Sequence, residues 1–104
     1  MARVLVVERN EKIGGLVSGM LGENGFEAVD VRHGAEMVVE LRRQAADVIL
    51  MDNKVPMGGL KTARLLRLHG KYNTIPIILS LPTDKQEARS TIEQAQQSGL
   101  GHFL

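Results

Sequence analysis

A carboxylate stands at the end of a run of residues that otherwise suits a protein interior. In VILMDNKVP, residues 48–56, four apolar residues are followed directly by Asp52. A second acid, Glu8, follows the apolar run RVLVV in the same way, and Arg9 comes directly after it. Carboxylates can accept a transferred group or bind a hard cation such as Mg²⁺, whereas an arginine beside them pairs with anions. An aspartate at the end of a strand is often only a turn residue. Whether Asp52 has a chemical role therefore depends on the elements around it.

The elements that would position these two acids follow from the pattern of apolar residues. Uninterrupted apolar runs indicate buried strands, and apolar residues at intervals of three and four indicate helices. Strands alternating with helices through short connections form an α/β fold with a doubly wound parallel sheet, whose binding crevice lies beyond the carboxyl ends of the strands. We therefore expect Glu8 and Asp52 side by side in one crevice. The predicted strands cover residues 3–7, 26–31, 48–51, 75–79 and 102–104, and the predicted helices cover about 13–24, 34–43, 59–69 and 83–97.

Local signals mark the ends of these elements. Gly25 is suited to the left-handed position that ends the first helix, and Thr83 with Gln86 has the form of a capping box that opens the last helix. Pro76 lies inside the fourth predicted strand, which is tolerable only near a strand start. Gly14 is one of four glycines that weaken the first helix by about 1 kcal/mol each relative to alanine.

Composition limits the class of protein. The chain has 104 residues, of which 43% are hydrophobic and 24% are charged, which suits one globular domain covering residues 1–104. It has no cysteine, which excludes disulfides and thiolate metal sites. The apolar run at residues 4–7 is too short for a signal peptide or a membrane span, so we expect a cytoplasmic location and no membrane partner.

The stretch from residue 54 to residue 83 contains no acid, whereas five lysines and arginines lie within it. Such a stretch can mark a nucleic-acid surface, but one tyrosine, two phenylalanines and no tryptophan offer little for stacked bases. A solvated helix face is the better interpretation, and nucleic acid is not expected as a partner. On the helix at 59–69, Leu65 and Leu68 fall outside the predicted buried stripe.

From Val4 to Leu104 the sequence resembles the receiver domain of two-component response regulators. The resemblance is carried, in order, by VLVVERNEKI, LGENGFEAV, HGAEMVVEL with ADVILMDNKVP, IPIILS, and QQSGLGHFL. It implies a flavodoxin-like fold with strand order 2-1-3-4-5 that would end before the family's fifth helix. It also implies a signalling module rather than an enzyme, whose partner is a histidine kinase or another signalling protein.

The resemblance implies roles for individual residues. Asp52 would be the phosphoacceptor, which makes the chain a phosphoprotein that receives its phosphoryl group from the kinase. Glu8, Asp52 and the backbone carbonyl of Lys54 would be the ligands of Mg²⁺. A hydroxyl at the end of the fourth strand would hold the phosphoryl oxygens. Counted from Pro76, the position of this hydroxyl is occupied by Leu81, and only a shift of one residue places Ser80 there. Phe103 matches the family's aromatic switch position and equally suits a plain core aromatic.

Several positions depart from the family's pattern. Arg9 replaces the second acid of the pair, and two like unit charges about 4 Å apart repel by about 4 kcal/mol at an effective dielectric of about 20. We therefore expect Mg²⁺ to bind weakly. The loop after Asp52 is one residue shorter than usual and has Gly58 where an acid is common, and the family's lysine after the fifth strand is absent. Arg9 has two interpretations: it pairs with Asp52 and blocks the metal, or it stands in for Mg²⁺ and clamps the phosphoryl oxygens.

Two alternative functions and one structural question arise at this point. A degenerate pseudo-receiver would act through protein contacts without being phosphorylated. A flavodoxin-like cofactor binder is disfavoured because the first loop, residues 8–11, has no glycine and two acids, which are hostile to a bound phosphate. Apolar side chains of the third and fourth strands are also expected to lack a cover on one face, so a homodimer through that face, an exchanged element or further residues of a longer protein would cover it.

Overall fold

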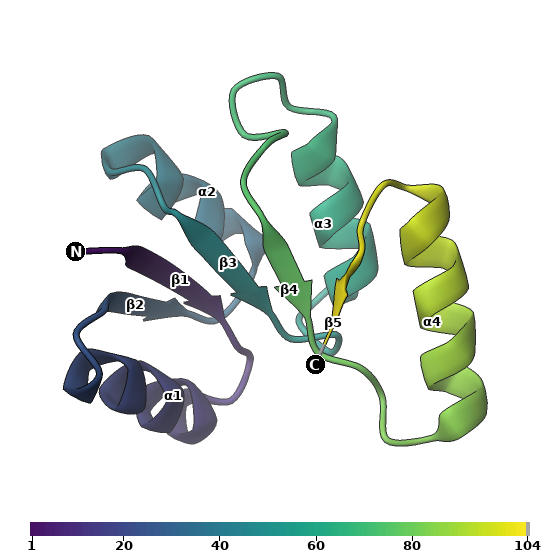
Figure 1. Ribbon diagram of the computed structural model, residues 1–104, viewed down its shortest axis with the longest axis horizontal. Helices are drawn as coiled ribbons and strands as arrows, with labels where there is room; N and C mark the ends of the chain where they lie inside the picture. Colours follow the sequence, from purple (N-terminus) through teal and green to yellow (C-terminus); the bar gives the residue numbers. More distant parts are fainter. Residues whose placement is uncertain (104) are drawn as a thin grey trace.

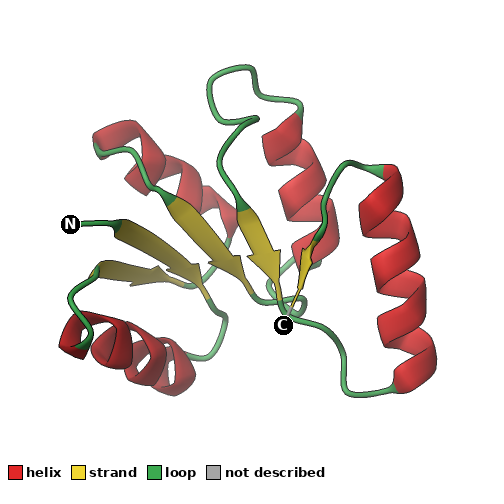
Figure 2. Cartoon of the chain, in the orientation of Figure 1, coloured by secondary structure: helices red, strands yellow, loops and turns green. Residues whose placement is uncertain are grey.

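The computed structural model describes the backbone of residues 1–103 and the side chains of residues 1–101. Its parallel sheet has the strand order β2-β1-β3-β4-β5, which confirms the predicted doubly wound α/β fold (Figures 1 and 2). The strands are β1 (Arg3–Val7), β2 (Glu27–Val31), β3 (Val48–Met51), β4 (Ile77–Leu79) and β5 (His102–Phe103). The helices are α1 (Glu11–Glu23), α2 (Gly34–Arg43), α3 (Gly59–Arg67) and α4 (Lys85–Gln97).

The two faces of the sheet are covered differently. Successive strand residues point to opposite faces, and Leu5, Ile49 and Ile77 lie on the face that forms one buried cluster with α2 and α3. Residues Leu50 and Ile78 point to the other face, where they line a pocket beside α1. All five residues of β1 are buried, as expected for the central strand of a sheet.

Several element boundaries differ from the prediction, and two of the differences have a clear local cause. Strand β4 begins at Ile77 rather than at residue 75, because Pro76 has no N–H to donate to the ladder. The N-cap of α4 is Asp84, whose side chain accepts a hydrogen bond from the Glu87 N–H at 2.9 Å, so the helix opens later than the capping box suggests. Strand β2 begins one residue later than predicted, and α3 ends at Arg67 in a tight turn.

Two predicted glycine roles can be compared with the backbone. Gly25 has φ +87° after α1 and lies in the left-handed region as predicted, and Gly99 has φ +79° after α4. Gly14 has a role that its low helix propensity did not indicate. It is buried, and a Cβ on it would lie 2.6 Å from Nη1 of Arg32. This glycine therefore makes room for a long side chain that comes from the end of β2.

The outer face of α1 is apolar and exposed. Ile13, Leu16 and Met20 are 47%, 64% and 63% exposed, and Leu50 and Ile78 on the neighbouring sheet face are only partly buried. Among the described side chains, Leu50 and Ile78 are therefore not fully covered on this face of the sheet. The sequence analysis expected this face to lack a cover. No helix within residues 1–103 is long and apolar enough to cross a membrane.

Candidate functional site

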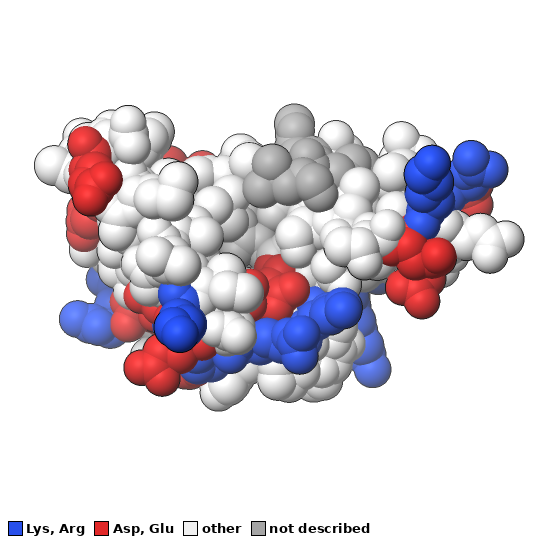
Figure 3. Space-filling model, turned by 90° about the horizontal axis from the view of Figure 1, so that it is seen from below, with Lys and Arg blue, Asp and Glu red and all other residues white. Residues whose placement is uncertain are grey.

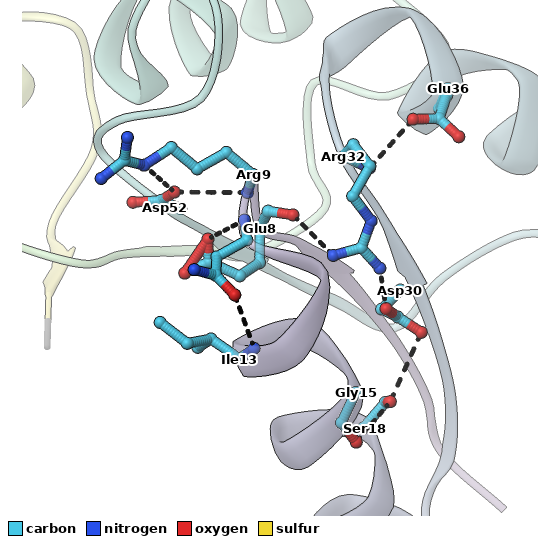
Figure 4. A network of polar contacts seen from close by, with 10 residues as sticks. Glu8, Arg9, Ile13, Gly15, Ser18, Asp30, Arg32, Glu36 and Asp52 are labelled. Atoms are coloured by element: carbon cyan, nitrogen blue, oxygen red, sulfur yellow. Dashed lines mark hydrogen bonds and ion pairs between the residues drawn. The ribbon is translucent and has the colours of Figure 1, made fainter.

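The two acids found in the sequence lie together at the carboxyl edge of the sheet. Val7 pairs with Met51 in the parallel ladder of β1 and β3, and the Asp52 N–H donates to the Val7 carbonyl at 2.9 Å. Glu8 and Asp52 follow directly, and both line one pocket of about 210 Å³ together with Ser80. Parallel strands of matched register thus bring the two carboxyl groups to neighbouring positions, as predicted (Figure 4).

Both carboxylate oxygens of Asp52 are engaged. Oδ1 accepts a hydrogen bond from the Lys54 N–H at 3.0 Å, and Oδ2 accepts one from the Arg9 N–H at 3.4 Å. The Arg9 guanidinium also reaches this carboxylate, with Nε 3.8 Å from Oδ2 (Figure 4). The side chain of Asp52 is only 12% exposed, whereas that of Arg9 is 56% exposed. A largely buried carboxylate is therefore held by two backbone donors and one cation that reaches in from solvent.

Glu8 is the second carboxylate of the site, and its environment disfavours its charged form. Partial burial raises the pKa of Glu8, and the neighbouring Asp52 carboxyl raises it further through a hydrogen bond and through like-charge repulsion. The Asn10 N–H, which donates to Glu8 Oε2 at 3.1 Å, and the charge of Arg9 lower the pKa in part. The net pKa is above its ordinary value of 4.5. Two carboxyl groups therefore share a crevice that carries one nearby guanidinium.

Ser80 supplies the hydroxyl at the end of β4. Its N–H donates to the Met51 carbonyl at 2.8 Å, which fixes the residue directly beside β3. Its Oγ accepts hydrogen bonds from the backbone N–H and the side-chain amide of Asn53 at 3.1 and 3.3 Å. Ser80 rather than Leu81 lines the pocket with Asp52. The hydroxyl is thus bonded to backbone beside Asp52, and Asn53 is a residue of this pocket region that the sequence pattern did not indicate.

Arg32 is a further residue that sequence reasoning missed. It follows β2, and its Nη1 donates to the Glu8 carbonyl at 2.9 Å, while its Nη2 contacts the Asp30 carboxylate (Figure 4). The Asp30 carboxylate in turn accepts from the Ser18 hydroxyl of α1 at 3.4 Å. Arg32 therefore ties the turn that carries Glu8 to β2 and α1. The one available signal was Gly14, whose missing Cβ leaves room for this guanidinium.

The loop between β3 and α3 folds tightly against the site. A Cβ on Gly59 would lie 2.3 Å from the Asp52 carbonyl oxygen, so only glycine fits this position. Met57 and Gly58 are both in the left-handed region, with φ of 73° and 84°. A bulky residue such as methionine rarely adopts this conformation. The short loop foreseen in the sequence is therefore accommodated by two consecutive left-handed residues.

The donor set at this edge fits Mg²⁺ poorly. The Mg²⁺ ligands implied by the sequence resemblance are Glu8, Asp52 and the Lys54 carbonyl, but the Arg9 guanidinium already occupies the space beside Asp52 Oδ2. Within residues 1–103, no group of three or more His, Cys, Asp or Glu side chains could hold a metal ion. Figure 3, seen from the side toward which the strands run, shows acidic atoms near the middle of this face beside a band of basic ones. A guanidinium competes with a divalent cation for the same carboxylate.

The predicted roles of the Lys54 carbonyl and of Phe103 stay predictions. The side chain of Lys54 is exposed, and its backbone N–H bonds to Asp52. The side chain of Phe103 lies outside the described residues, so the aromatic switch position stays a prediction. His33 caps α2 by accepting a hydrogen bond from the Glu36 N–H at 3.4 Å.

Comparison with known proteins identifies related sequences. The family described as the response regulator receiver domain matches residues 4–104. The CAI-1 autoinducer sensor kinase/phosphatase CqsS of Vibrio cholerae is 33% identical over 104 residues, which cover 98% of this chain and 15% of that protein. The phosphate regulon transcriptional regulatory protein PhoB of Klebsiella pneumoniae is 32% identical over 88 residues, which cover 84% of this chain and 38% of that protein. The chain therefore spans well under half the length of these two relatives.

Solved structures show the same fold. The chemotaxis protein CheY4 of Vibrio cholerae superposes with a TM-score of 0.86 and 25% identity, covering 100% of this chain and 85% of that chain. The signal receiver domain of a signal transduction histidine kinase from Syntrophus aciditrophicus superposes with a TM-score of 0.83 and 25% identity, covering 100% of this chain and 77% of that chain.

Proposed function

Because the chain belongs to the response regulator receiver domain family, we propose that it acts in two-component signalling with Asp52 as its phosphoacceptor and Arg9 in place of a magnesium-binding acid. Members of this family are signalling modules rather than typical enzymes, and they interact with histidine kinases. A histidine kinase, or another signalling protein, is therefore the proposed partner, and a cytoplasmic location is part of the same proposal.

The position of Asp52 carries this proposal. It is a largely buried carboxylate at the carboxyl edge of the central strands, beside Glu8 and Ser80 in one pocket. In the proposed transfer, an oxygen of Asp52 forms a bond to the phosphorus of a phosphohistidine, and the bond from phosphorus to the imidazole nitrogen breaks. The imidazole keeps the electron pair of that bond and takes up a proton, and Asp52 becomes an acyl phosphate.

Two residues beside Asp52 are suited to the added negative charge. The Arg9 guanidinium can follow the carboxylate and donate to phosphoryl oxygens, since planar guanidinium groups bind phosphate in this way. The Ser80 hydroxyl can donate its proton to a phosphoryl oxygen, because the bonds from Asn53 use only its lone pairs. Family members generally bind Mg²⁺ at the phosphorylation site, where it neutralises phosphoryl charge. Here the fit of Mg²⁺ is poor, and we propose that Arg9 takes over part of that neutralisation.

A second candidate function is a pseudo-receiver that acts through protein contacts and is not phosphorylated. The observation that favours it is the engagement of both Asp52 oxygens by Arg9 and by the Lys54 N–H. An acceptor oxygen must leave such contacts before it can attack phosphorus. The two candidates differ in one measurable property, which is the formation of an acyl phosphate.

Intact mass spectrometry after incubation with acetyl phosphate tests the proposal. The wild-type chain should gain the mass of one phosphoryl group, and Asp52→Asn should gain none. Glu11→Gln is the matched control, because Glu11 is an exposed acid near the same crevice, and it should behave like the wild type. A label that persists in Asp52→Asn would refute the assignment of the acceptor. No label on the wild type under any condition would leave the pseudo-receiver as the function.

A further inference from the structure

A second and larger pocket lies between α2 and α3, on the opposite side of the sheet from α1. It has a volume of about 410 Å³, within the range of about 300–1,000 Å³ typical of ligand pockets. We call it the α2–α3 pocket. Its walls are mainly apolar and include Met37 and Val38 of α2, Leu65 and Leu66 of α3, and Met57 of the loop before α3.

The polar groups of the α2–α3 pocket are mostly used within the fold. The Thr62 hydroxyl donates to the Gly58 carbonyl at 2.8 Å, and the His33 ring contacts Glu36. A Cβ on Gly34 would lie 2.9 Å from Cγ2 of Thr62, so this glycine lets the start of α2 approach α3 closely. Apart from the His69 ring, which also lines the pocket, what the pocket offers to an occupant is therefore apolar surface.

Large apolar side chains stand exposed around this pocket. Met57 is 66% exposed, Leu65 is 50% exposed, and Leu68 on the outer side of α3 is 82% exposed. Met57 is also the one non-glycine residue with positive φ within residues 1–103. Strained backbone of this kind is concentrated at functional sites, and methionine adapts its shape to different partners. The exposed methionine at the mouth of the pocket is thus suited to contact with another molecule.

Two lysines without acidic partners lie close in sequence to residues that line the pocket. Lys61 lies one helical turn before Leu65, and Lys54 lies two residues before Pro56, which lines the pocket. Both are exposed, and neither forms an ion pair with any side chain of residues 1–101. The two acids of α2 already have partners: Glu36 is bonded to His33 and to the Arg32 N–H, and Glu40 pairs with Arg3 and Arg43. Lys61 therefore adds positive charge next to the α3 wall of the pocket, and Lys54 adds it to the loop that leads to that wall.

We propose that the α2–α3 pocket binds an amphipathic helix of a partner protein, whose apolar side chains enter the pocket and whose acidic side chains face Lys54 and Lys61. An amphipathic helix presents side chains at i, i+4 and i+7 along one stripe, which suits a groove between two helices. Acidic residues beside that stripe complement the lysines and exclude basic partners. This binding does not require Asp52 to be phosphorylated.

The test uses a synthetic helical peptide with leucines at i, i+4, i+7 and i+11 and glutamates beside them. Binding is followed by NMR of the ¹³C-labelled methionine methyl groups, which report on different surfaces. Met37 and Met57 line the α2–α3 pocket, whereas Met20 lies on the exposed face of α1. The peptide should shift Met37 and Met57 saturably and leave Met20 unmoved. A peptide with lysine in place of each glutamate should bind about tenfold more weakly at low salt.

Three variants distinguish binding in the α2–α3 pocket from binding elsewhere on the chain. Leu65→Asp changes a half-exposed residue and should abolish the shift of Met57, whereas Leu16→Asp on α1 is the matched control and should keep it. Asp52→Asn should also keep the shift, so failure of the phosphoacceptor proposal would leave this one standing. The proposal is overturned by an absence of shifts, by shifts at Met20 instead, or by equal binding of the lysine peptide. It is also overturned if Met57 shifts with protein concentration alone, which would indicate a second copy as the occupant.

Discussion

Arg9 and Asp52 form an ion pair across the carboxyl ends of β1 and β3, with Nε of Arg9 3.8 Å from Oδ2 of Asp52. The backbone N–H of Arg9 donates to the same oxygen at 3.4 Å. Because the Arg9 side chain is largely exposed, water and salt weaken the attraction, so the pair can open. It nevertheless places a positive charge where two carboxyl groups meet, and several properties of the site depend on it.

The first prediction concerns Mg²⁺ affinity. Amide NMR shifts of Glu8, Asp52 and Lys54 should stay unmoved when Mg²⁺ is added in the millimolar range, because the Arg9 guanidinium repels the ion and occupies one carboxylate. Arg9→Asp should restore saturable shifts at these three residues, since it replaces the cation with a third carboxylate. Saturable binding by the wild type at submillimolar Mg²⁺ would contradict this account of Arg9.

The second prediction concerns the glycines of α1. Gly14→Ala should lower the free energy of unfolding by about 1–3 kcal/mol, because the new methyl group collides with the Arg32 guanidinium. Gly15→Ala is a matched control on the next residue, where a Cβ meets nothing within 4 Å. It should raise the free energy of unfolding by up to about 1 kcal/mol through helix propensity. Urea denaturation of both variants measures the difference, and equal effects would show that Arg32 does not occupy this space in solution.

The third prediction concerns pH. The pKa of Glu8 in the folded chain is above its ordinary value of 4.5, chiefly because of burial and because of Asp52 beside it. The stability that its bound proton contributes is fully present below the unfolded pKa and is lost as pH rises through the folded pKa. Glu8→Gln should therefore stabilise the chain relative to the wild type at neutral pH. This gain in the free energy of unfolding should shrink as the pH falls toward 4.5, the ordinary pKa of the Glu8 carboxyl.

Thermal or urea denaturation in EDTA at several pH values measures this gain. Glu23→Gln, an exposed acid at the opposite end of α1, controls for the loss of one negative charge. A gain for Glu8→Gln that is independent of pH, or no larger than that of Glu23→Gln, would be incompatible with a raised pKa at Glu8.

The fourth prediction concerns the exposed face of α1. Ile13, Leu16 and Met20 stand exposed beside the partly buried Leu50 and Ile78, and apolar patches of several hundred Å² are rare on stable monomers. We predict that a second copy covers this face at high protein concentration. Sedimentation velocity should show a dimer that dissociates on dilution and is absent in Leu16→Glu. Leu68→Glu, on the outer side of α3, should leave the dimer intact. A wild-type chain that stays monomeric at high concentration would exclude a homodimer through this face.

The features that depend on the local pattern of apolar residues could be predicted from the sequence. Apolar runs and helical spacing predicted the bounds of β1, α2 and β3 as they are observed, and the order of strands came from the family resemblance. The two acids that follow β1 and β3 could be placed together because parallel strands of one sheet end at the same edge. The start of β4 was predicted too early, since the cost of Pro76 in the ladder was underestimated.

The sequence was insufficient where side chains meet across distant elements. The contact of Arg32 with the Glu8 carbonyl joins residues 24 positions apart, and no spacing rule predicts which long side chain reaches a given carbonyl. The left-handed conformation of Met57 is imposed by a short loop on a residue type that disfavours it. The sequence also left two interpretations of Arg9 open, and the ion pair with Asp52 is compatible with both of them before phosphorylation.

In the proposed function, Arg9 takes the place of a magnesium ligand beside the phosphoacceptor Asp52. The most direct test is intact mass spectrometry of the wild type and of Arg9→Asp after incubation with acetyl phosphate, in Mg²⁺ and in EDTA. The wild type should take up one phosphoryl group slowly and to a similar extent in both conditions. Arg9→Asp should be labelled faster in Mg²⁺ and hardly at all in EDTA. Rapid labelling of the wild type that requires Mg²⁺ would contradict the claim.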